Sequence, residues 1–177
     1  VRRGLTKPAF DSLLSLSFYQ QPYRHWLTRW KFQQDLSAGD LLQQQFADLL
    51  AQFESDAQPL PEAILYVPMH PRRQRQRGFN QAQMLAEAAA KQLQIPLLPV
   101  LQRPNKQPPQ VGLSRKARLR NLRHAFSLKA GTLLPSHIAL VDDVITTGAT
   151  INTLCKLLRR HGAQQISVWT VAVTLHD

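Results

Sequence analysis

Short apolar runs alternate with amphipathic stretches along most of the chain, and this alternation predicts strands and helices in turn. Residues 64–67 and 137–141 are continuous apolar runs between turn-forming residues, as expected of strands buried on both faces of a sheet. Residues 80–93 and 150–161 have apolar side chains at helical spacing, and residues 165–174 form a last strand-like run. The order strand, helix, strand, helix, strand predicts an α/β protein with a parallel sheet flanked by helices.

The first sixty residues follow a different pattern. An apolar stretch at residues 13–19 is compatible with a strand, and amphipathic helices are expected over residues 23–32 and 40–53. Two prolines then separate this part of the chain from the first strand of the sheet. We therefore divide the chain into a mostly helical segment, residues 1–60, and an α/β domain, residues 61–177.

The segments between these elements are less regular. Residues 68–79 are basic and contain no apolar periodicity, which predicts a loop. A second short strand is expected at residues 97–101, followed by a proline-containing loop over residues 102–112. Ser114 is a suitable N-cap for a short basic helix that reaches residue 124.

Charge changes this picture because it is unevenly distributed. The formal net charge is +11, and residues 71–130 hold thirteen Lys and Arg but a single acid, whereas the rest of the chain holds nine basic and ten acidic residues. The middle third therefore predicts an anionic partner: phosphate groups, nucleic acid or an acidic surface. Phe79 and Phe126 are the only aromatic residues there. If this segment binds single-stranded DNA, we therefore expect it to contact the phosphates rather than to stack on the bases.

Several classes of protein are disfavoured by composition. No apolar run approaches the ~18–20 residues of a membrane span, and no signal-peptide pattern follows the N-terminus. The single cysteine, Cys155, excludes an internal disulfide and is expected to be a buried core thiol. No His and Cys residues have the spacing of zinc ligands. These features predict a cytoplasmic protein without membrane insertion.

The segment Leu140–Thr150, with the sequence LVDDVITTGAT, carries the most informative chemistry. An apolar strand ends in Asp142 and Asp143, and a loop of small residues then leads into a helix. Ligands of open α/β sheets bind beyond the carboxyl ends of the strands, where a loop entering a helix presents free N–H groups to an anion. The residues predicted to bind a phosphate are Thr146, Thr147, Gly148, Ala149 and Thr150. The two acids suit sugar hydroxyls, or Mg²⁺ through water, and together these groups predict a ribose 5-phosphate site.

This segment resembles the phosphoribosyl pyrophosphate (PRPP) motif of type I phosphoribosyltransferases. Segments in residues 30–32 (WKF), 77–81 (RGFNQ) and 110–126 extend the resemblance over almost the whole chain, to the ComF family of competence proteins and its GntX-like members. Proteins of that family usually begin with a four-cysteine zinc ribbon, which this sequence lacks. We therefore expect Val1 to be a truncation or proteolysis point, and zinc to belong only to the missing ribbon.

The resemblance implies a type I phosphoribosyltransferase-like sheet with residues 1–60 as a helical hood. It implies that Asp142 and Asp143 are the catalytic acids at the ribose, and that Mg²⁺ arrives near them with PRPP rather than as a directly bound metal. A loop after the first sheet strand would hold the pyrophosphate, and a flexible loop would close over it. By position, the pyrophosphate residues are Met69, His70, Arg72 and Arg73, and the flexible-loop candidates are Lys106, Arg115 and Arg118.

The function implied by the resemblance is a PRPP-binding protein, a phosphoribosyltransferase by fold, that acts in natural transformation and DNA uptake. One alternative is a non-catalytic accessory module that binds single-stranded DNA or a competence helicase. Another is a regulator that senses PRPP without transferring its ribosyl group. The sequence defines neither the acceptor of a transfer nor the oligomeric state, and it assigns no role to Lys31.

Overall fold

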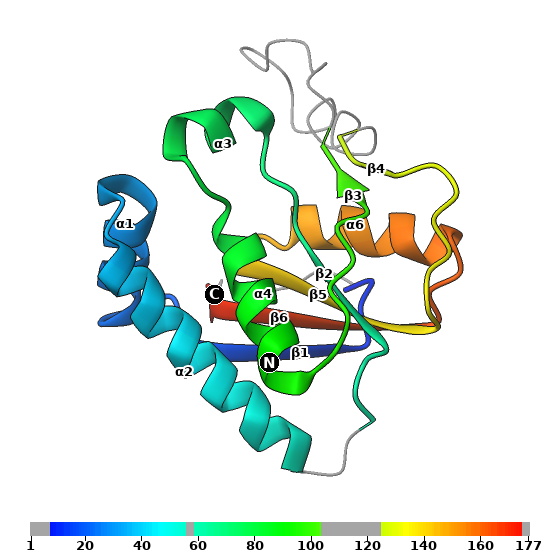
Figure 1. Ribbon diagram of the computed structural model, residues 1–177, viewed down its shortest axis with the longest axis horizontal. Helices are drawn as coiled ribbons and strands as arrows, with labels where there is room; N and C mark the ends of the chain where they lie inside the picture. Colours follow the sequence, from blue (N-terminus) through cyan, green and yellow to red (C-terminus); the bar gives the residue numbers. More distant parts are fainter. Residues whose placement is uncertain (1–7, 56–58, 104–124, 175–177) are drawn as a thin grey trace.

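The computed structural model describes residues 8–55, 59–103 and 125–174. Its centre is a sheet of four parallel strands in the order β1-β6-β5-β2 (Figure 1). The strands are β1 (Ser12–Phe18), β2 (Ala63–Tyr66), β5 (His137–Ile145) and β6 (Gln165–Val173), and a separate antiparallel pair is formed by β3 (Leu101–Gln102) and β4 (Ser127–Leu128). The predicted α/β class with a parallel sheet is confirmed.

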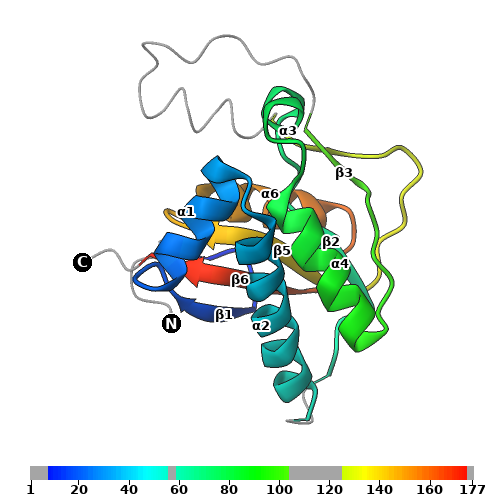
Figure 2. The same cartoon turned by 60° about the vertical axis from the view of Figure 1, so that its left-hand side comes forward.

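Helices cover both faces of the sheet (Figures 1 and 2). The helices are α1 (Tyr23–Gln33), α2 (Leu36–Ser55), α3 (Pro71–Arg77), α4 (Gln81–Leu93) and α6 (Ala149–Arg160). Helices α1, α2 and α4 pack on one face, and α6 packs on the other. Among the described residues, none of these helices has both the length and the hydropathy of a membrane span.

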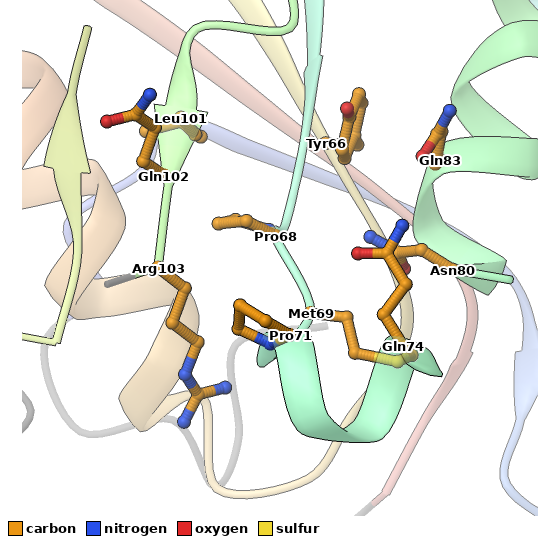
Figure 3. A pocket seen from close by; sticks show the side chains of 10 residues that line it. All are labelled: Tyr66, Pro68, Met69, Pro71, Gln74, Asn80, Gln83, Leu101, Gln102 and Arg103. Carbon is orange, nitrogen blue, oxygen red and sulfur yellow. The ribbon is translucent and has the colours of Figure 1, made fainter. Parts of the chain in front are cut away.

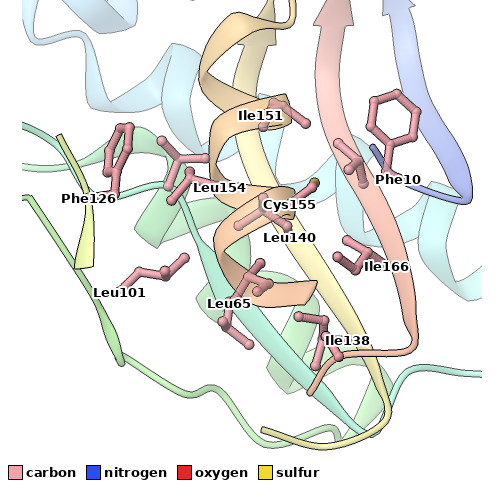
Figure 4. Packing of buried hydrophobic residues seen from close by; sticks show 14 of the residues in the cluster. Phe10, Leu65, Leu101, Phe126, Ile138, Leu140, Ile151, Leu154, Cys155 and Ile166 are labelled. Carbon is pink, nitrogen blue, oxygen red and sulfur yellow. The ribbon is translucent and has the colours of Figure 1, made fainter. Parts of the chain in front are cut away.

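Alternation along the buried strands builds the two layers of the core. On β5, Ile138 and Leu140 face α6, while Ala139 and Val141 face α2 and α4. Figure 4 shows the first layer, where Cys155 of α6 lies among the apolar side chains of the sheet. Cys155 is fully buried, as predicted, and burial raises the pKa of its thiol to about 12.

The N-terminal segment contributes an edge strand to the sheet as well as two helices. The predicted strand near residue 13 forms as β1, and it pairs in parallel with β6, from Ser12 opposite Ser167 to Phe18 opposite Val173. Residues 1–60 therefore supply one edge of the sheet as well as α1 and α2. A domain boundary at residue 60 stays a prediction.

The basic segment after β2 was wrongly predicted as a continuous loop, because residues 71–77 form α3. Pro71 opens this helix at a position where its missing N–H costs nothing, and His70 caps it by accepting the Arg72 N–H at Nδ1, at 3.2 Å. Gly78 ends it with φ of 87°, a left-handed conformation that favours glycine. Local capping thus makes a helix that has no apolar stripe.

Two strand predictions also change. Strand β5 continues through Ile145 rather than ending at Val141, because β6 is equally long and offers hydrogen-bonding partners up to Val173. The expected strand at residues 97–101 is reduced to one bridge between Leu97 and Ile64, and to the short β3. The helix predicted over residues 114–124 lies outside the described residues.

Candidate functional site at the carboxyl end of β5

The two adjacent acids lie near the carboxyl end of β5, within the strand rather than after it. Asp142 is opposite Thr170 of β6, whose hydroxyl donates to the carbonyl oxygen of Asp143 at 3.0 Å. The main-chain N–H of Asp143 donates to Oδ1 of Asp142 at 2.9 Å. The sheet therefore fixes the backbone of both acids, and their side chains alternate to opposite faces, as strand geometry requires.

The two carboxyl groups differ in their proton affinity. Burial and the neighbouring Asp143 carboxylate raise the pKa of Asp142 to about 8, although the Asp143 N–H and the Lys31 charge oppose the rise. Asp143 forms an ion pair instead, with its Oδ2 at 2.8 Å from Nζ of Lys31. Near neutral pH the Asp142 carboxyl group therefore favours its protonated form.

Lys31 is the main site residue that sequence reasoning missed. It comes from α1, and its side chain is 18 % exposed, so the ion pair with Asp143 is shielded from bulk water. The signal was present as the motif in residues 30–32, but the motif alone gave Lys31 no partner. The partner appears only when α1 is folded over the end of β5.

The motifs in residues 30–32 and 77–81 meet next to the acids. The Trp30 and Phe79 rings are stacked with their centroids 6.1 Å apart, and the Arg77 guanidinium lies 5.6 Å from the centroid of the Phe32 ring. Arg77 also donates from Nη1 to Oε1 of Gln81 at 2.8 Å. Burial lowers the pKa of Arg77, and the charge of Asp143 partly offsets that effect. These contacts hold α1 against the segment before α4.

The small-residue loop after β5 forms the second part of the site. Asp142 and residues 144–151 line a pocket of about 50 Å³, which we call the phosphate-loop pocket. Gly148 begins α6 with φ of 70°, and the first N–H bonded within the helix is that of Asn152, to the Gly148 carbonyl at 2.8 Å. The Ala149 N–H donates to Oγ1 of Thr147 at 3.4 Å, and within the described residues the N–H groups of Thr150 and Ile151 remain for an anion, where the helix dipole also favours negative charge. All five predicted phosphate residues, 146 to 150, line this pocket with Asp142.

The remaining predicted residues lie elsewhere. Met69 lines a different, larger pocket beside β2 (Figure 3), and His70 caps α3. Arg72 and Arg73 are exposed on α3 and make no ion pair with a described residue. Lys106, Arg115 and Arg118 lie outside the described residues. A pyrophosphate role for any of these residues stays a prediction.

The described side chains at this site are too few to bind a metal ion without further ligands. Among the described residues, no group of three or more His, Cys, Asp or Glu side chains could hold a metal ion. One oxygen of Asp143 is already paired with Lys31, and Asp142 favours its protonated form. A magnesium ion here needs further oxygen ligands, and a diphosphate-bearing substrate brings such oxygens with it.

Comparisons with known proteins agree with this geometry. The sequence model of the phosphoribosyl transferase domain family matches residues 80–176. Competence protein F of Haemophilus influenzae is 38% identical over 174 residues, which cover 94% of this chain and 74% of that protein. DNA utilization protein YhgH of Escherichia coli K12 is 30% identical over 170 residues, or 95% of this chain and 74% of that protein.

The solved structures that resemble this chain support the fold. A glutamine PRPP amidotransferase from B. subtilis superposes with a TM-score of 0.50 at 21% identity, over 73% of this chain and 26% of that protein. A likeness at that identity concerns the architecture alone. The sequence matches reach further, and they show that this chain belongs to the ComF/YhgH family of proteins with a phosphoribosyl transferase domain.

Proposed function

We propose that this chain binds PRPP as its magnesium complex at the carboxyl end of β5. The observation that carries the proposal is the phosphate-loop pocket, in which the first turn of α6 and an acid of β5 line the same hollow. The hollow is on the scale of one phosphate group, and the free N–H groups and the helix dipole suit the 5-phosphate. Asp142 and Asp143 would hold the ribose hydroxyls next to it.

The diphosphate of PRPP would extend toward the segment between β2 and α3. In this proposal the N–H groups of Met69 and His70 and the side chains of Arg72 and Arg73 meet its charge. Both arginines are exposed and free of ion pairs within the described residues, which supports a role with an external anion. Lys106, Arg115 and Arg118 would approach from the flexible loop.

The reaction we propose is a displacement at C1 of the ribose. The bond from C1 to the diphosphate oxygen breaks, both of its electrons leave with the diphosphate, and positive charge develops on the ring. An electron pair of the acceptor then forms the new bond to C1. The acids would hold the ribose in place while cations neutralise the charge that gathers on the leaving diphosphate.

The second part of the proposal is a role in DNA uptake. The curated relatives are named competence and DNA utilization proteins, and the middle third of this chain carries most of its positive charge. Single-stranded DNA is the partner we propose, bound through its phosphates, with a DNA-uptake helicase as the alternative partner. PRPP would then act either as a substrate or as a sensed ligand that leaves unchanged.

Calorimetry with Mg²⁺-PRPP tests the site. The double variant Asp142→Asn/Asp143→Asn is expected to bind at least about tenfold more weakly than wild type, because losing one charge-assisted hydrogen bond to the ribose costs about 1.4 kcal/mol or more. The matched control is Asp48→Asn on α2, an exposed acid whose partner is Gln44. That control is expected to bind like wild type.

Equal affinity of the double variant and wild type would contradict the site. Release of diphosphate, followed over time in the same samples with candidate acceptors, separates the transferase from the regulator. Binding of PRPP without turnover under any acceptor condition favours the regulator.

A further inference from the structure

A second pocket lies at the edge of the sheet formed by β2, opposite the edge formed by β1 (Figure 3). We call it the edge pocket; its volume is about 380 Å³, and it shares no residue with the phosphate-loop pocket. Its lining consists of Tyr66, Pro68, Met69, Pro71, Gln74, Asn80, Gln83, Leu101, Gln102 and Arg103. None of these ten residues is acidic.

Arg103 gives the edge pocket a positive charge, and an acid beside the lining, Glu87, accepts a hydrogen bond from Gln83 at 2.9 Å. Arg103 has a buried Nε that lacks a hydrogen-bond partner within the described residues, and its guanidinium lies 5.2 Å from the centroid of the Phe126 ring. Burial, together with the charge of Arg73, lowers the pKa of Arg103. No described acid pairs with either arginine. A half-buried cation with an unused N–H, repelled by a second cation, is stabilised when an anion binds.

The opposite wall has the chemistry of a nucleobase site. Gln74 lies across from Arg103 in Figure 3, and its amide makes no hydrogen bond with a described residue. An amide presents one donor and one acceptor, which is the pattern that base edges present in return. Tyr66 is a half-buried aromatic residue of the lining on which a base could stack, and burial together with the charge of Glu87 raises the pKa of its hydroxyl, which stays protonated as a donor.

The Asn80 side chain also lines this wall, but both of its polar atoms already form hydrogen bonds within the protein. Its Nδ2 donates to the Val67 carbonyl at 3.0 Å, and its Oδ1 accepts the Ala82 N–H at 3.1 Å. Asn80 is therefore committed to holding α4 against β2. Gln74 and Tyr66 remain available to a ligand.

We propose that the edge pocket takes one nucleotide unit of single-stranded DNA, with its base against Tyr66 and Gln74 and its phosphate at Arg103. The inference rests on the proposed DNA-handling role and gives that role a place in the fold. A neighbouring phosphate of the same strand would meet Arg75, which is exposed on α3 and free of ion pairs with described residues. The pocket thus adds a base contact to a track that sequence reasoning limited to phosphates.

Fluorescence anisotropy with a labelled oligothymidylate, and with an abasic oligomer of the same length, tests the proposal. Wild type is expected to bind the abasic oligomer about tenfold more weakly, as the loss of one stacked base predicts. Tyr66→Leu is expected to abolish that difference, and Gln74→Ala, which changes an exposed side chain of α3, to reduce it. Arg103→Gln is expected to weaken both oligomers about tenfold, whereas Arg24→Gln, an exposed arginine of α1, leaves both unchanged.

Equal binding of the two oligomers by wild type would overturn the proposal, since phosphate contact alone would then explain it. Displacement of the oligothymidylate by inorganic pyrophosphate would also overturn it, and would assign the edge pocket to a diphosphate. Calorimetry with Mg²⁺-PRPP on the same variants keeps the two proposals apart. Tyr66→Leu and Gln74→Ala are expected to bind PRPP like wild type, whatever their effect on DNA.

Discussion

Asp142 and Asp143 are neighbours on one strand, yet their surroundings give them different partners. Lys31 pairs with Asp143 at 2.8 Å, while Asp142 is half-buried and its pKa rises to about 8 because of desolvation and the neighbouring Asp143. Of the two acids, only Asp143 therefore forms an ion pair with Lys31.

The raised pKa of Asp142 predicts how stability depends on pH. Because the folded-state pKa of about 8 exceeds the ordinary value of 3.8, the folded protein binds more protons than the unfolded chain between these values. The contribution of Asp142 to the free energy of unfolding therefore falls as pH rises from about 4 to about 8. Asp142→Asn is expected to remove this fall and to be more stable than wild type at pH 8–9, by on the order of 2 kcal/mol. Urea unfolding over this pH range measures it.

Two further variants complete this measurement. Lys31→Met removes a cation that opposes the raised pKa of Asp142, so the fall in stability should extend to higher pH. Asp48→Asn, on the exposed side of α2, should keep the wild-type pH dependence. If Asp142→Asn loses stability between pH 4 and pH 8 as steeply as wild type does, another group carries the pH dependence.

Residues of the site were predictable where their signal is local. The acids and the loop 146–150 form one continuous segment, so strand, loop and helix could be predicted together. The structure brings Asp142 and the loop to one pocket, whereas Asp143 pairs with Lys31 instead. Lys31 could not be assigned in this way. Its contact with Asp143 depends on how α1 packs over the sheet, which no local pattern specifies.

At the level of elements, α1 is the part of the N-terminal segment that reaches the site. Three consecutive residues, 30 to 32, contact Phe79, Asp143 and Arg77 in turn. Helix α2 supports them from behind, because Gly39 lets its backbone approach the buried Trp30 ring. A Cβ atom at Gly39 would lie 2.4 Å from Nε1 of Trp30.

Gly39→Ala is therefore expected to destabilise the protein, although alanine favours helix formation by about 1 kcal/mol over glycine. The added methyl group must push a fully buried, rigid ring or separate α1 from α2, and overpacking of this kind typically costs about 1–3 kcal/mol. Urea unfolding gives the difference. Gln44→Ala, an exposed change on the same helix, is the control and should stay close to wild type. A Gly39→Ala protein more stable than wild type would contradict the close packing.

The sequence predicted elements well where periodicity is strong. Helices α1, α2, α4 and α6 lie close to their expected ranges because each has an apolar stripe. Helix α3 has no such stripe and depends on its caps, His70 and Gly78, so its arginine-rich sequence resembled a loop. The short β3 depends on pairing with β4, which is distant in sequence.

For the whole molecule, the ion pairs that the structure describes do not involve the arginines of α3. The described ion pairs involve Asp11, Asp35 and Asp143, and none includes an arginine of α3. Within the described residues, Arg72, Arg73 and Arg75 of α3 are therefore exposed and not neutralised by an ion pair. Such a surface attracts polyanions over distances set by ionic strength.

A salt titration of single-stranded DNA binding tests this surface. The logarithm of the association constant should fall linearly with the logarithm of salt concentration, with a slope of about −0.7 for each phosphate contacted. Arg75→Gln should make the slope less steep by about 0.7. Arg24→Gln removes the same charge from an exposed position on α1 and should leave the slope unchanged. A flat dependence for wild type would exclude a phosphate track.

The position of β1 has a consequence for how the chain folds during synthesis. Strand β1 is made early, but it pairs with β6, and β6 also separates β1 from β5 in the sheet. The sheet cannot close until β6 has left the ribosome, and parallel pairing over so long a separation is slow. Until β6 is synthesised and pairs with β1, the apolar strands of the nascent chain should therefore remain exposed. The demand for chaperones should be greatest during that interval.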